Sequence, residues 1–383
     1  MSDPLPRIGI NATALLSPRT GIGQYVFHLG RKLLESGEVE PYFFYANHWS
    51  TALRDTPLTH IATIKRYVKR IVPQPYIVLR CLSQMLFTAG LRRHPVALYH
   101  EPNYLAFRFS GPSVVTVHDA SWVRHPETHP KERIDAIDRY LQRSLDSAAA
   151  ILTDSEFVKR EVVELFGIPP EKIFPVLLGV APDFSPRPPG ACREFLTQQE
   201  LTFGRYVLSV GTLEPRKNIP VLIDAYSLLP AALQRRFPLV LAGMRGWLTS
   251  SLEARMKPLV ERGVIKPLGY VPDAAMPLLY SGAATFVFPS LYEGFGLPVL
   301  EAMACGTPVI SSLTSSLPEV IGDAGILVEP LNVESISASL RQILEDGTLA
   351  ENLSCRGVQR AAGFSWEKTA SETIGVYRRA LAA

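Results

Sequence analysis

The fold is indicated most clearly by Ser290-Leu-Tyr-Glu-Gly-Phe-Gly-Leu-Pro-Val-Leu-Glu-Ala-Met-Ala-Cys-Gly-Thr-Pro-Val-Ile-Ser311. The residues just before it, Thr285–Phe288, are β-branched and aromatic, which predicts a buried strand. A loop with two glycines follows, and Pro298 suits the first turn of a helix that Gly306 would end. Together, strand, glycine loop and helix start predict an anion site, because backbone N–H groups at a helix start point towards a ligand.

Two carboxylates bracket this glycine loop, Glu293 before it and Glu301 inside the expected helix. A carboxylate accepts two hydroxyl hydrogen bonds at once, and the glycines allow the backbone to approach closely. A ligand with phosphate and polyol groups, such as a nucleotide sugar, fits this pattern. The alternative is an ordinary βαβ crossover with a tight turn and two solvated glutamates.

Length and composition predict two domains and exclude some partners. A chain of 383 residues with 47% hydrophobic residues is long enough for two cores. The net charge of +3 gives no reason to expect nucleic acid as a partner. The charge is unevenly distributed, however. No acidic residue lies between Asp55 and Glu101, whereas seven basic ones do: Lys65, Arg66, Lys69, Arg70, Arg80, Arg92 and Arg93.

The cysteines and the apolar segments predict a cytoplasmic protein. The cysteines lie far apart without metal-ligand spacing, so we expect reduced thiols; they are Cys81, Cys192, Cys305 and Cys355. The chain enters an apolar strand at Ile8 without a basic leader, and the uncharged run 274–292 is broken by prolines and a glycine. We therefore expect neither a secretory signal nor a membrane span.

The first half begins with a second strand, glycine loop and helix pattern. A strand is expected at 7–12, a loop at 17–23 and a helix at 25–34, so Gly21 and Gly23 could present N–H groups to a phosphate. Val26 stands where a dinucleotide fingerprint needs its third glycine, which disfavours a nicotinamide enzyme.

Polar residues follow the next apolar strands. His100 and Glu101 come after an expected strand at 96–99, and His118 and Asp119 come after one at 113–117. In an open α/β sheet these strand ends line the ligand crevice. A histidine beside an aspartate at such an end is a candidate functional residue, although a single histidine is more often structural.

The acid-free interval contains two expected helices, 61–72 and 76–91, with mixed apolar and basic residues. Such faces suit a membrane surface or an anionic acceptor. An ordinary pair of helices whose arginines fringe a core is the alternative.

The second half restarts after a linker at 182–190, which is rich in proline. A strand at 206–210 leads to Arg216 and Lys217, two adjacent cations suited to a diphosphate, with solvated charge as the plain alternative. Strand and helix alternate throughout both halves, so the expected fold class is α/β with two doubly wound parallel sheets.

These motifs resemble those of the GT-B glycosyltransferases, specifically the retaining glycosyltransferase family 4. The matching segments are Glu293 to Glu301 in its Gly-Pro context, Gly211-Thr-Leu-Glu-Pro-Arg-Lys-Asn218, Thr116-Val-His-Asp119, Gly21-Ile-Gly23 and Phe364-Ser-Trp366. The resemblance implies two Rossmann-like domains that face a cleft and close over the donor. Residues 1–185 would form the acceptor-side domain, 200–364 the domain that binds the nucleotide sugar, and 365–383 a helix that crosses back.

The resemblance also implies a role for each candidate residue. Many relatives carry an arginine where this chain has Thr212, and Arg216 would take over that cation's role. In the implied donor site, Glu301 would bind the ribose, Asp273 the base and Glu293 the transferred sugar, with His118 against the same sugar. The diphosphate would be bound by Arg216 and Lys217. Sugar and phosphate would also be held by the loop residues Gly294, Phe295, Gly296 and Leu297, and the phosphates would be covered by Gly21 and Gly23.

The implied reaction is transfer of a hexose, with mannose or rhamnose favoured, from a GDP-linked donor to a lipid-linked saccharide. Retention would follow from front-face attack, and no metal or other cofactor is expected, because no Asp-x-Asp motif is present. The protein would then lie at the cytoplasmic face of the membrane, in peripheral contact with an anionic surface. The alternatives are a UDP-sugar-dependent transferase, a nucleotide-sugar epimerase and a non-catalytic protein that binds nucleotide sugars.

Overall fold

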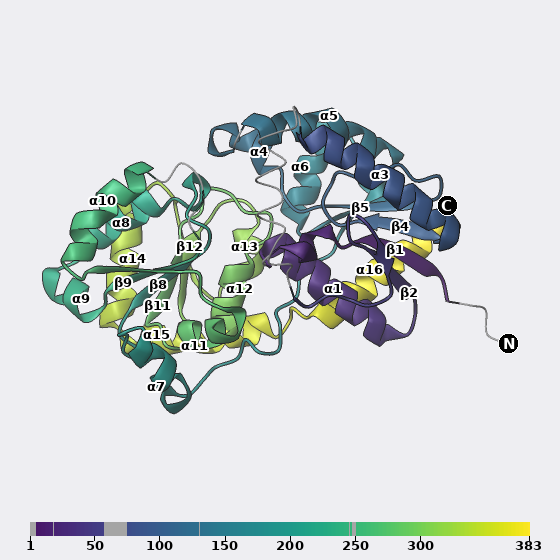
Figure 1. Ribbon diagram of the computed structural model, residues 1–383. Helices are drawn as coiled ribbons and strands as arrows, with labels where there is room; N and C mark the ends of the chain where they lie inside the picture. The colour runs from purple at the N-terminus through teal and green to yellow at the C-terminus, as the bar shows by residue number, and fades with distance from the viewer. Residues whose placement is uncertain (1–4, 18, 57–74, 130, 245, 247–249) are drawn as a thin grey trace. The chain divides into compact units, whose positions relative to one another are not determined.

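The chain folds into two compact units (Figure 1). The computed structural model describes residues 5–17, 19–56, 75–129, 131–244, 246 and 250–383. Unit 1 comprises Met1–Gly179 and Trp366–Ala383, and unit 2 comprises Val180–Ser365. The proline-rich segment expected as a linker belongs to unit 2, where α7 (Pro189–Gln198) begins inside it.

Unit 1 contains a sheet with the order β3-β2-β1-β4-β5-β6-β7 among its described residues. Every pairing is parallel except that of β2 with β3. The strands are β1 (Arg7–Asn11), β2 (Glu40–Phe44), β3 (Trp49–Ser50), β4 (Leu98–Glu101), β5 (Ser113–Val117), β6 (Ala150–Thr153) and β7 (Ile173–Pro175). All five residues of β5 are buried, as expected for a strand covered on both faces.

Helices cover both faces of this sheet (Figure 1). One face packs against α3 (Pro75–Arg93), α5 (Lys131–Ser147) and α6 (Glu156–Phe166), whose apolar residues share a core with β5 and β6. The other side carries α1 (Gly21–Ser36) and α16 (Trp366–Ala382), which pack together, and α16 also contacts β4, β5 and β6. Thr369 on α16 donates a hydrogen bond to the Leu177 carbonyl, 2.8 Å away. A short helix, α4 (Ser121–Arg124), follows β5.

Unit 2 contains a parallel sheet with the order β10-β9-β8-β11-β12-β13. The strands are β8 (Val207–Val210), β9 (Leu239–Ala242), β10 (Ile265–Gly269), β11 (Thr285–Phe288), β12 (Val309–Ser312) and β13 (Ile326–Val328). The chain builds from β8 to β10 towards one edge and then returns to place β11 on the other side of β8. The strand order therefore reverses between β8 and β11, which is where ligands bind in open α/β sheets.

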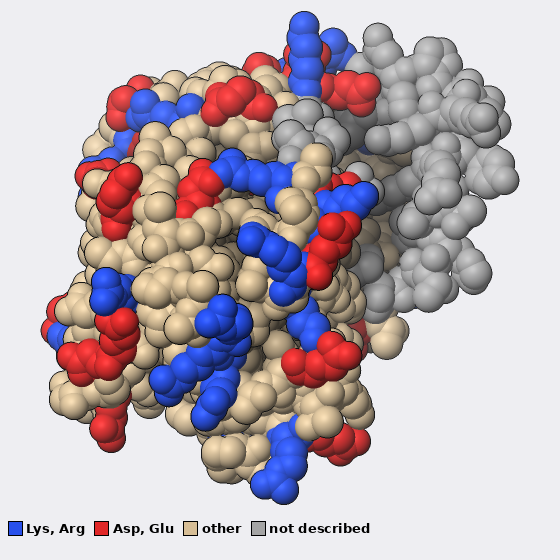
Figure 2. Space-filling view, turned by 90° about the vertical axis from the view of Figure 1, so that its left-hand side faces the viewer, with Lys and Arg blue, Asp and Glu red and all other residues tan. Residues whose placement is uncertain are grey.

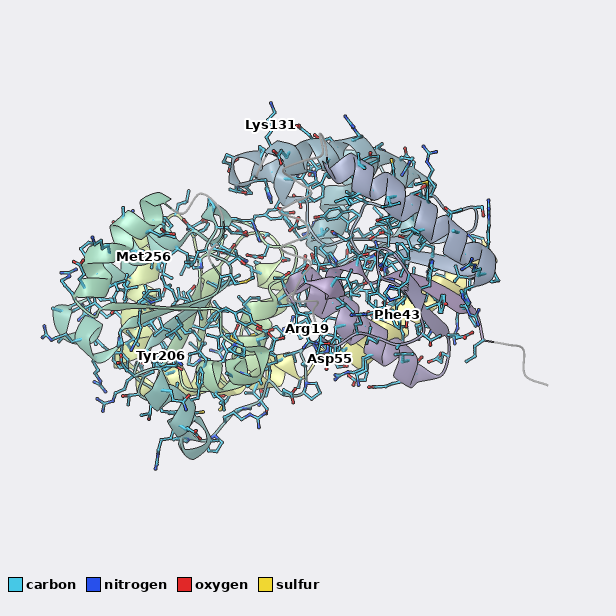
Figure 3. All side chains as sticks on the ribbon, viewed as in Figure 1. Arg19, Phe43, Asp55, Lys131, Tyr206 and Met256 are labelled. Atoms are coloured by element: carbon cyan, nitrogen blue, oxygen red, sulfur yellow. The ribbon has the colours of Figure 1, made fainter. Side chains whose placement is uncertain are left out.

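The helices of unit 2 also cover both faces of its sheet. They are α7, α8 (Ile219–Ser227), α9 (Ala231–Arg236), α10 (Ser250–Glu261), α11 (Met276–Ser281), α12 (Leu297–Ala304), α13 (Leu317–Ile321), α14 (Val333–Glu345) and α15 (Gly347–Ala361). Tyr206 and Met256 are buried in this unit, and Phe43 is buried in unit 1 (Figure 3). On the face viewed in Figure 2, Lys and Arg side chains are interspersed with Asp and Glu side chains.

The two doubly wound parallel sheets confirm the predicted fold class, but two local predictions were wrong. Gly21 and Gly23 do not lie in a loop, because α1 already begins at Gly21. His100 and Glu101 do not follow a strand: they are its last two residues, since β4 pairs with both neighbours up to that point. A third prediction, the helix at 61–72, lies outside the described residues and stays a prediction.

Candidate active site

The loops that follow β8, β11 and β12 meet at the carboxyl edge of the unit 2 sheet. The loop after β8 ends in a short 3-10 turn, Pro215–Lys217, and the backbone carbonyl of Arg216 accepts a hydrogen bond from the Leu291 N–H at 2.9 Å. Asn218 fixes the same loop, because its side-chain amide donates to the carbonyls of Pro289 at 3.1 Å and Pro330 at 2.6 Å. Residues far apart in the sequence are thus held together at the point where the strand order reverses.

Both predicted cations bind Glu293. The Oε2 atom of Glu293 lies 2.9 Å from Nη1 of Arg216, and its Oε1 atom lies 2.6 Å from Nζ of Lys217. Ser290 makes the third contact with this carboxylate by donating a hydrogen bond to Oε1, also at 2.6 Å. Arg216 is held from its other side by Glu214, at 2.8 Å. The positive charges of two cations are therefore compensated by two carboxylates in one cluster.

This cluster is buried, and its pKa values depend on that burial. Glu293 is only 8% exposed. Burial alone would raise the pKa of Glu293, but Arg216 and Lys217 outweigh burial and lower it to about 2. Burial also lowers the pKa of Lys217, while Glu293 acts in the opposite direction. Glu293 is therefore ionised at neutral pH, and its charge compensates that of the two largely enclosed cations.

The glycine loop after Glu293 is fixed by two serines that follow β12. Ser315 accepts a hydrogen bond from the Glu293 N–H at 2.9 Å, and Ser316 donates to the carbonyls of Glu293 at 2.8 Å and Phe295 at 2.9 Å. Gly296 has φ of +113°, and a Cβ atom there would lie 2.7 Å from a methyl group of Leu317. Only glycine fits this position, and α12 starts directly after it.

Glu301 differs electrostatically from Glu293, although both are glutamates on one short segment. It lies in α12 and accepts a hydrogen bond from the Tyr280 hydroxyl at 2.9 Å. The pKa of Glu301 is raised to about 8, mainly by burial; the hydrogen bond from Tyr280 acts in the opposite direction, and the nearby carboxylate of Asp273 contributes a further upward effect to this value. The Glu301 carboxyl is therefore largely protonated at neutral pH and can donate a hydrogen bond as well as accept one.

His118 follows β5 in unit 1 and is hydrogen-bonded at both ring nitrogens. Nδ1 lies 2.7 Å from Oδ2 of Asp154, and Nε2 lies 2.7 Å from the carbonyl oxygen of Pro102. A carbonyl oxygen can only accept, so Nε2 carries a proton. Burial would lower the pKa of His118, but the ion pair with Asp154 outweighs burial and raises it. Both contacts favour the doubly protonated, cationic ring.

The first turn of α1 lies on the same side of unit 1 as His118. Tyr25, four residues after Gly21, packs edge-on against the His118 ring, with centroids 4.9 Å apart. Gly21 is exposed and Gly23 is buried. Arg19 precedes this turn and forms an ion pair with Asp55 at 3.1 Å (Figure 3). A cation thus stands beside the N–H groups that the sequence analysis assigned to phosphate.

The structure divides the predicted site residues into two groups. In unit 2 it brings Glu293 together with Arg216 and Lys217, and it places Glu301 near Asp273. The two glutamates are connected along the chain by a segment that includes Gly294, Phe295, Gly296 and Leu297. In unit 1 it groups His118 with the helix that starts at Gly21 and Gly23.

Several contacting residues were missed by the sequence analysis: Asp154, Glu214, Tyr280, Ser290, Ser315 and Ser316. For the serines, the run of small hydroxylated residues directly after β12 was an available signal.

The arrangement in unit 2 can bind an anionic, hydroxyl-rich ligand. Two fixed cations and a glycine-bounded helix start suit phosphate oxygens, and two carboxyl groups of different charge suit hydroxyls. Within the described residues, no group of three or more His, Cys, Asp or Glu side chains could hold a metal ion. None of the described helices is both long and apolar enough to cross a membrane.

Comparisons with known proteins agree with this chemistry. Residues 19–184 match the family model Glycosyltransferase Family 4, and residues 197–360 match Glycosyl transferases group 1. The O-antigen chain mannosyltransferase B of Escherichia coli is 40% identical over 371 residues, which cover 94% of this chain and 96% of that protein. The serotype-specific mannosyltransferase WbdA of the same species is 36% identical over 241 residues, covering 62% of this chain and 29% of that protein.

A similar fold is found in a solved structure, sucrose-phosphate synthase from Thermosynechococcus elongatus. It has a TM-score of 0.77 at 20% identity and covers 99% of this chain and 100% of its own. At that identity the likeness concerns the fold alone. With both family models matched in order and a relative similar over almost its full length, the chain belongs to glycosyltransferase family 4, with the GT-B fold.

Proposed function

We propose that this glycosyltransferase moves mannose from GDP-mannose to a lipid-linked saccharide during the synthesis of a cell-surface polysaccharide of the O-antigen type. Support for mannose comes from the two Escherichia coli relatives, both of which are named as mannosyltransferases. Rhamnose from a GDP-linked donor is the second choice for the sugar.

The observation that carries this proposal is the cluster of Arg216, Lys217 and Glu293 beside the start of α12. A departing nucleoside diphosphate gains negative charge as its bond to the sugar breaks. Fixed cations and helix N–H groups stabilise that charge more in the transition state than in the ground state. Glu293 then has a natural partner in the hydroxyls of the transferred sugar, because it lies beside both cations.

The same cluster is the reason for proposing transfer without a divalent metal ion. Arg216 and Lys217 would supply the positive charge that a metal ion supplies elsewhere. Both are held rigidly by Glu293, so little reorganisation is needed when the charge on the leaving group develops.

Retention of the anomeric configuration is proposed to follow from front-face attack, with the leaving phosphate taking the proton of the acceptor hydroxyl. His118 would serve this step as a cation rather than as a general base, because both of its ring nitrogens already face acceptors. Its positive charge would favour the developing negative charge of the leaving group.

The donor base and ribose would be bound around Glu301. A largely protonated Glu301 can donate to one ribose hydroxyl and accept from another. Asp273, whose charge acts on Glu301, would accept hydrogen bonds from the edge of a guanine.

The acceptor would be held at the cytoplasmic face of the membrane. The absence of acidic residues between Asp55 and Glu101 in the sequence supports peripheral contact with anionic lipid. Lys65, Arg66, Lys69 and Arg70, which belong to this interval, lie outside the described residues.

The decisive experiment measures binding and transfer together. Calorimetry with GDP, UDP and dTDP in the presence of a chelator should give the strongest binding for GDP. Transfer from GDP-mannose to a saccharide acceptor, followed by NMR, should give a product with the anomeric configuration of the donor. Strongest binding of UDP would select a UDP-sugar donor, and binding abolished by the chelator would refute metal independence.

Two variants separate transfer from its alternatives. Glu301→Ala should weaken GDP binding about tenfold, the loss expected for a hydrogen bond to a charged or strongly polar group. Glu351→Ala, at an exposed position on α15, is the matched control and should change nothing. If the sugar of the nucleotide sugar is altered in a reaction that contains no acceptor, the protein is an epimerase. If the nucleotide sugar binds but is not turned over, the protein is non-catalytic.

A further inference from the structure

Helix α3 presents its apolar side to solvent. Five large apolar residues of this helix are exposed: Val78, Leu79, Leu82, Met85 and Leu86. Their spacing places them within one stripe of the helix, which we name the outward face of α3. Met85 is 62% exposed, Val78 51% and Leu82 47%. Phe87, on the opposite side of the helix, is fully buried in the core of unit 1.

A charged residue of the same helix is turned the other way. Arg80 points towards the protein and donates hydrogen bonds to the carbonyls of Leu105 at 3.0 Å and Ala106 at 2.8 Å. Its guanidinium group also lies over the ring of Tyr140, 4.7 Å from the centroid. The helix thus turns an arginine inward and apolar side chains outward, the reverse of a helix that faces water only.

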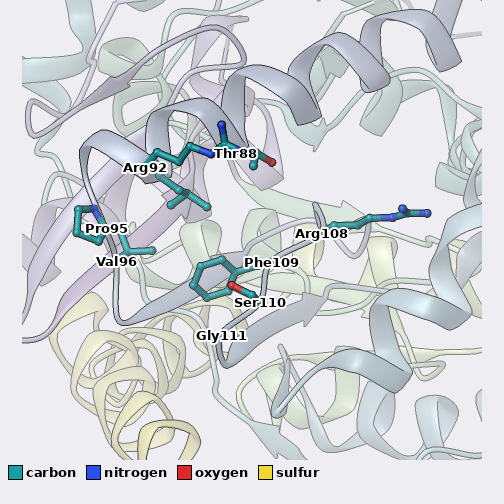
Figure 4. A pocket seen from close by; sticks show the side chains of 9 residues that line it. Thr88, Arg92, Pro95, Val96, Arg108, Phe109, Ser110 and Gly111 are labelled. Carbon is teal, nitrogen blue, oxygen red and sulfur yellow. The ribbon is translucent and has the colours of Figure 1, made fainter.

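Basic residues stand at the C-terminal end of the outward face. Arg93 falls within the stripe and Arg92 beside it, and both are exposed in the last turn. Beside this turn is a cavity of about 720 Å³ (Figure 4), lined by Thr88, Leu91, Arg92, Pro95, Val96, Arg108, Phe109, Ser110 and Gly111. Arg92 and Phe109 lie on different sides of the cavity, and the side chain of Arg108 extends away from both (Figure 4). A lining that combines apolar side chains with arginines suits an amphiphile with an anionic head.

The rim of this cavity is held in place by α3 itself. The side-chain amide of Gln84 accepts from the Arg108 N–H at 2.7 Å and donates to the Arg108 carbonyl at 3.1 Å. The segment that carries Arg108 and Phe109 is therefore tied to the helix, and Arg92, at the edge of the outward face, also lines the cavity.

We propose that the outward face of α3, with Arg92, Arg93 and Arg108, docks on an anionic lipid bilayer. The apolar side chains would enter the boundary between headgroups and acyl chains, and the arginines would pair with lipid phosphates. A second copy of the same helix fits less well. The sequence from Thr56 to His100 contains no carboxylate, so a facing α3 would offer these arginines no partner.

This inference rests on the proposed lipid-linked acceptor, because docking here would bring the enzyme to that acceptor. It can fail independently, however. Transfer to a water-soluble saccharide should be unchanged by substitutions on the outward face, whereas failure of soluble transfer in the unsubstituted protein would count against the proposed function alone.

The first experiment is co-sedimentation with vesicles of phosphatidylcholine, with and without phosphatidylglycerol. The protein should bind the anionic vesicles, and binding should weaken as salt is raised. Leu82→Ser with Met85→Ser should reduce binding by about tenfold or more. Arg92→Ala and Arg108→Ala should each reduce it about fivefold. Matched controls are Leu228→Ser, Leu331→Ser and Arg235→Ala, at exposed positions of unit 2, and these should bind normally.

A fluorescent label tests the contact directly, because two cysteines are exposed and two are buried. Cys81 lies on α3 and Cys355 on α15, whereas Cys192 and Cys305 are buried. An environment-sensitive label on Cys81, in Cys355→Ser protein, should shift to the blue when anionic vesicles are added. The same label on Cys355, in Cys81→Ser protein, should not shift.

Each outcome of these experiments either supports docking through α3 or overturns it. A blue shift at Cys81 together with loss of binding in Leu82→Ser/Met85→Ser supports docking through α3. Equal shifts at both labels, or binding unaffected by the serine substitutions, would overturn it. A shift at Cys81 that rises with protein concentration without vesicles would also overturn it, in favour of a second copy on this face.

Discussion

Replacing Glu293 by Gln should destabilise unit 2 by an amount that the structure allows us to estimate. Glu293 contacts Arg216 at 2.9 Å and Lys217 at 2.6 Å, and its side chain is only 10% exposed. Its pKa lies at about 2 instead of the ordinary 4.5. At about 1.36 kcal/mol per pKa unit, the ionised Glu293 carboxylate contributes about 3 kcal/mol to the free energy of unfolding. At pH 7, the free energy of unfolding of the Glu293→Gln variant should be lower by roughly this amount.

The pH dependence of this loss has a definite sign. Because the pKa of Glu293 is lowered on folding, its contribution is complete above the unfolded value of 4.5 and disappears as the pH falls towards 2. The difference between the two proteins should therefore be constant near neutrality and shrink below pH 4.5. For a unit of this size, about 3 kcal/mol corresponds to a fall in Tm of about 6–12 °C.

The same substitution should strengthen nucleotide binding while it impairs transfer. Without Glu293, the charges of Arg216 and Lys217 are no longer compensated, so the diphosphate meets no competing anion. Differential scanning calorimetry at pH 7 and pH 3 and titration with GDP measure both effects. Glu345→Gln is the control, because Glu345 pairs with Arg341 at an exposed site and should cost less than about 0.5 kcal/mol. Unchanged stability, or weaker GDP binding, in Glu293→Gln would refute the reasoning.

Three further predictions follow from buried groups. Asp154→Asn should lower the pKa of His118, because the anion that raises it is removed, and an NMR titration of the ring should detect the change, whereas an unaltered pKa would contradict the ion pair. His100 is buried, and burial lowers its pKa to about 3. As the pH falls from about 6.5 to 3, the unfolded chain binds a proton that the folded one does not, so the free energy of unfolding of unit 1 should fall by about 4–5 kcal/mol. In denaturant unfolding, His100→Gln should make the free energy of unfolding depend less on pH over this range. Glu214→Gln should raise the KM for the donor more than it lowers kcat if Glu214 only positions Arg216, and a fall in kcat alone would argue against that role.

Much of the fold could be predicted because its signals are local. Strands such as Thr285–Phe288 consist of β-branched and aromatic residues, and Gly296 marks a backbone conformation that only glycine adopts readily. The predicted pairing of strand ends with polar residues located His118 correctly after β5. It misplaced His100, because a buried polar residue inside a strand has the same sequence signature as one just beyond it.

The electrostatic state of the site could not be predicted, because it depends on residues far apart in the chain. Lys217 and Glu293 are 76 positions apart, and nothing in either local sequence indicates that they are paired. Asp154 is 36 positions from His118, and their contact raises the pKa of the histidine. The outward face of α3 is a similar case. Its periodicity predicts a helix, but only the packing of Phe87 and Arg80 indicates which side faces the solvent.

The pairing of Glu293 with the two cations changes the interpretation of the Glu-x7-Glu pattern. Before a donor binds, the side chains of Arg216 and Lys217 are only 13% and 11% exposed, and without an anion beside them their desolvation would oppose folding. Glu293 supplies that anion and at the same time fixes both cations where a diphosphate would need them. When the donor arrives, the diphosphate can take over the compensation, which leaves the Glu293 oxygens available to sugar hydroxyls. One carboxylate would then stabilise the empty site and bind the sugar in the occupied one, whereas Glu301, largely protonated at neutral pH, cannot replace it in the first role.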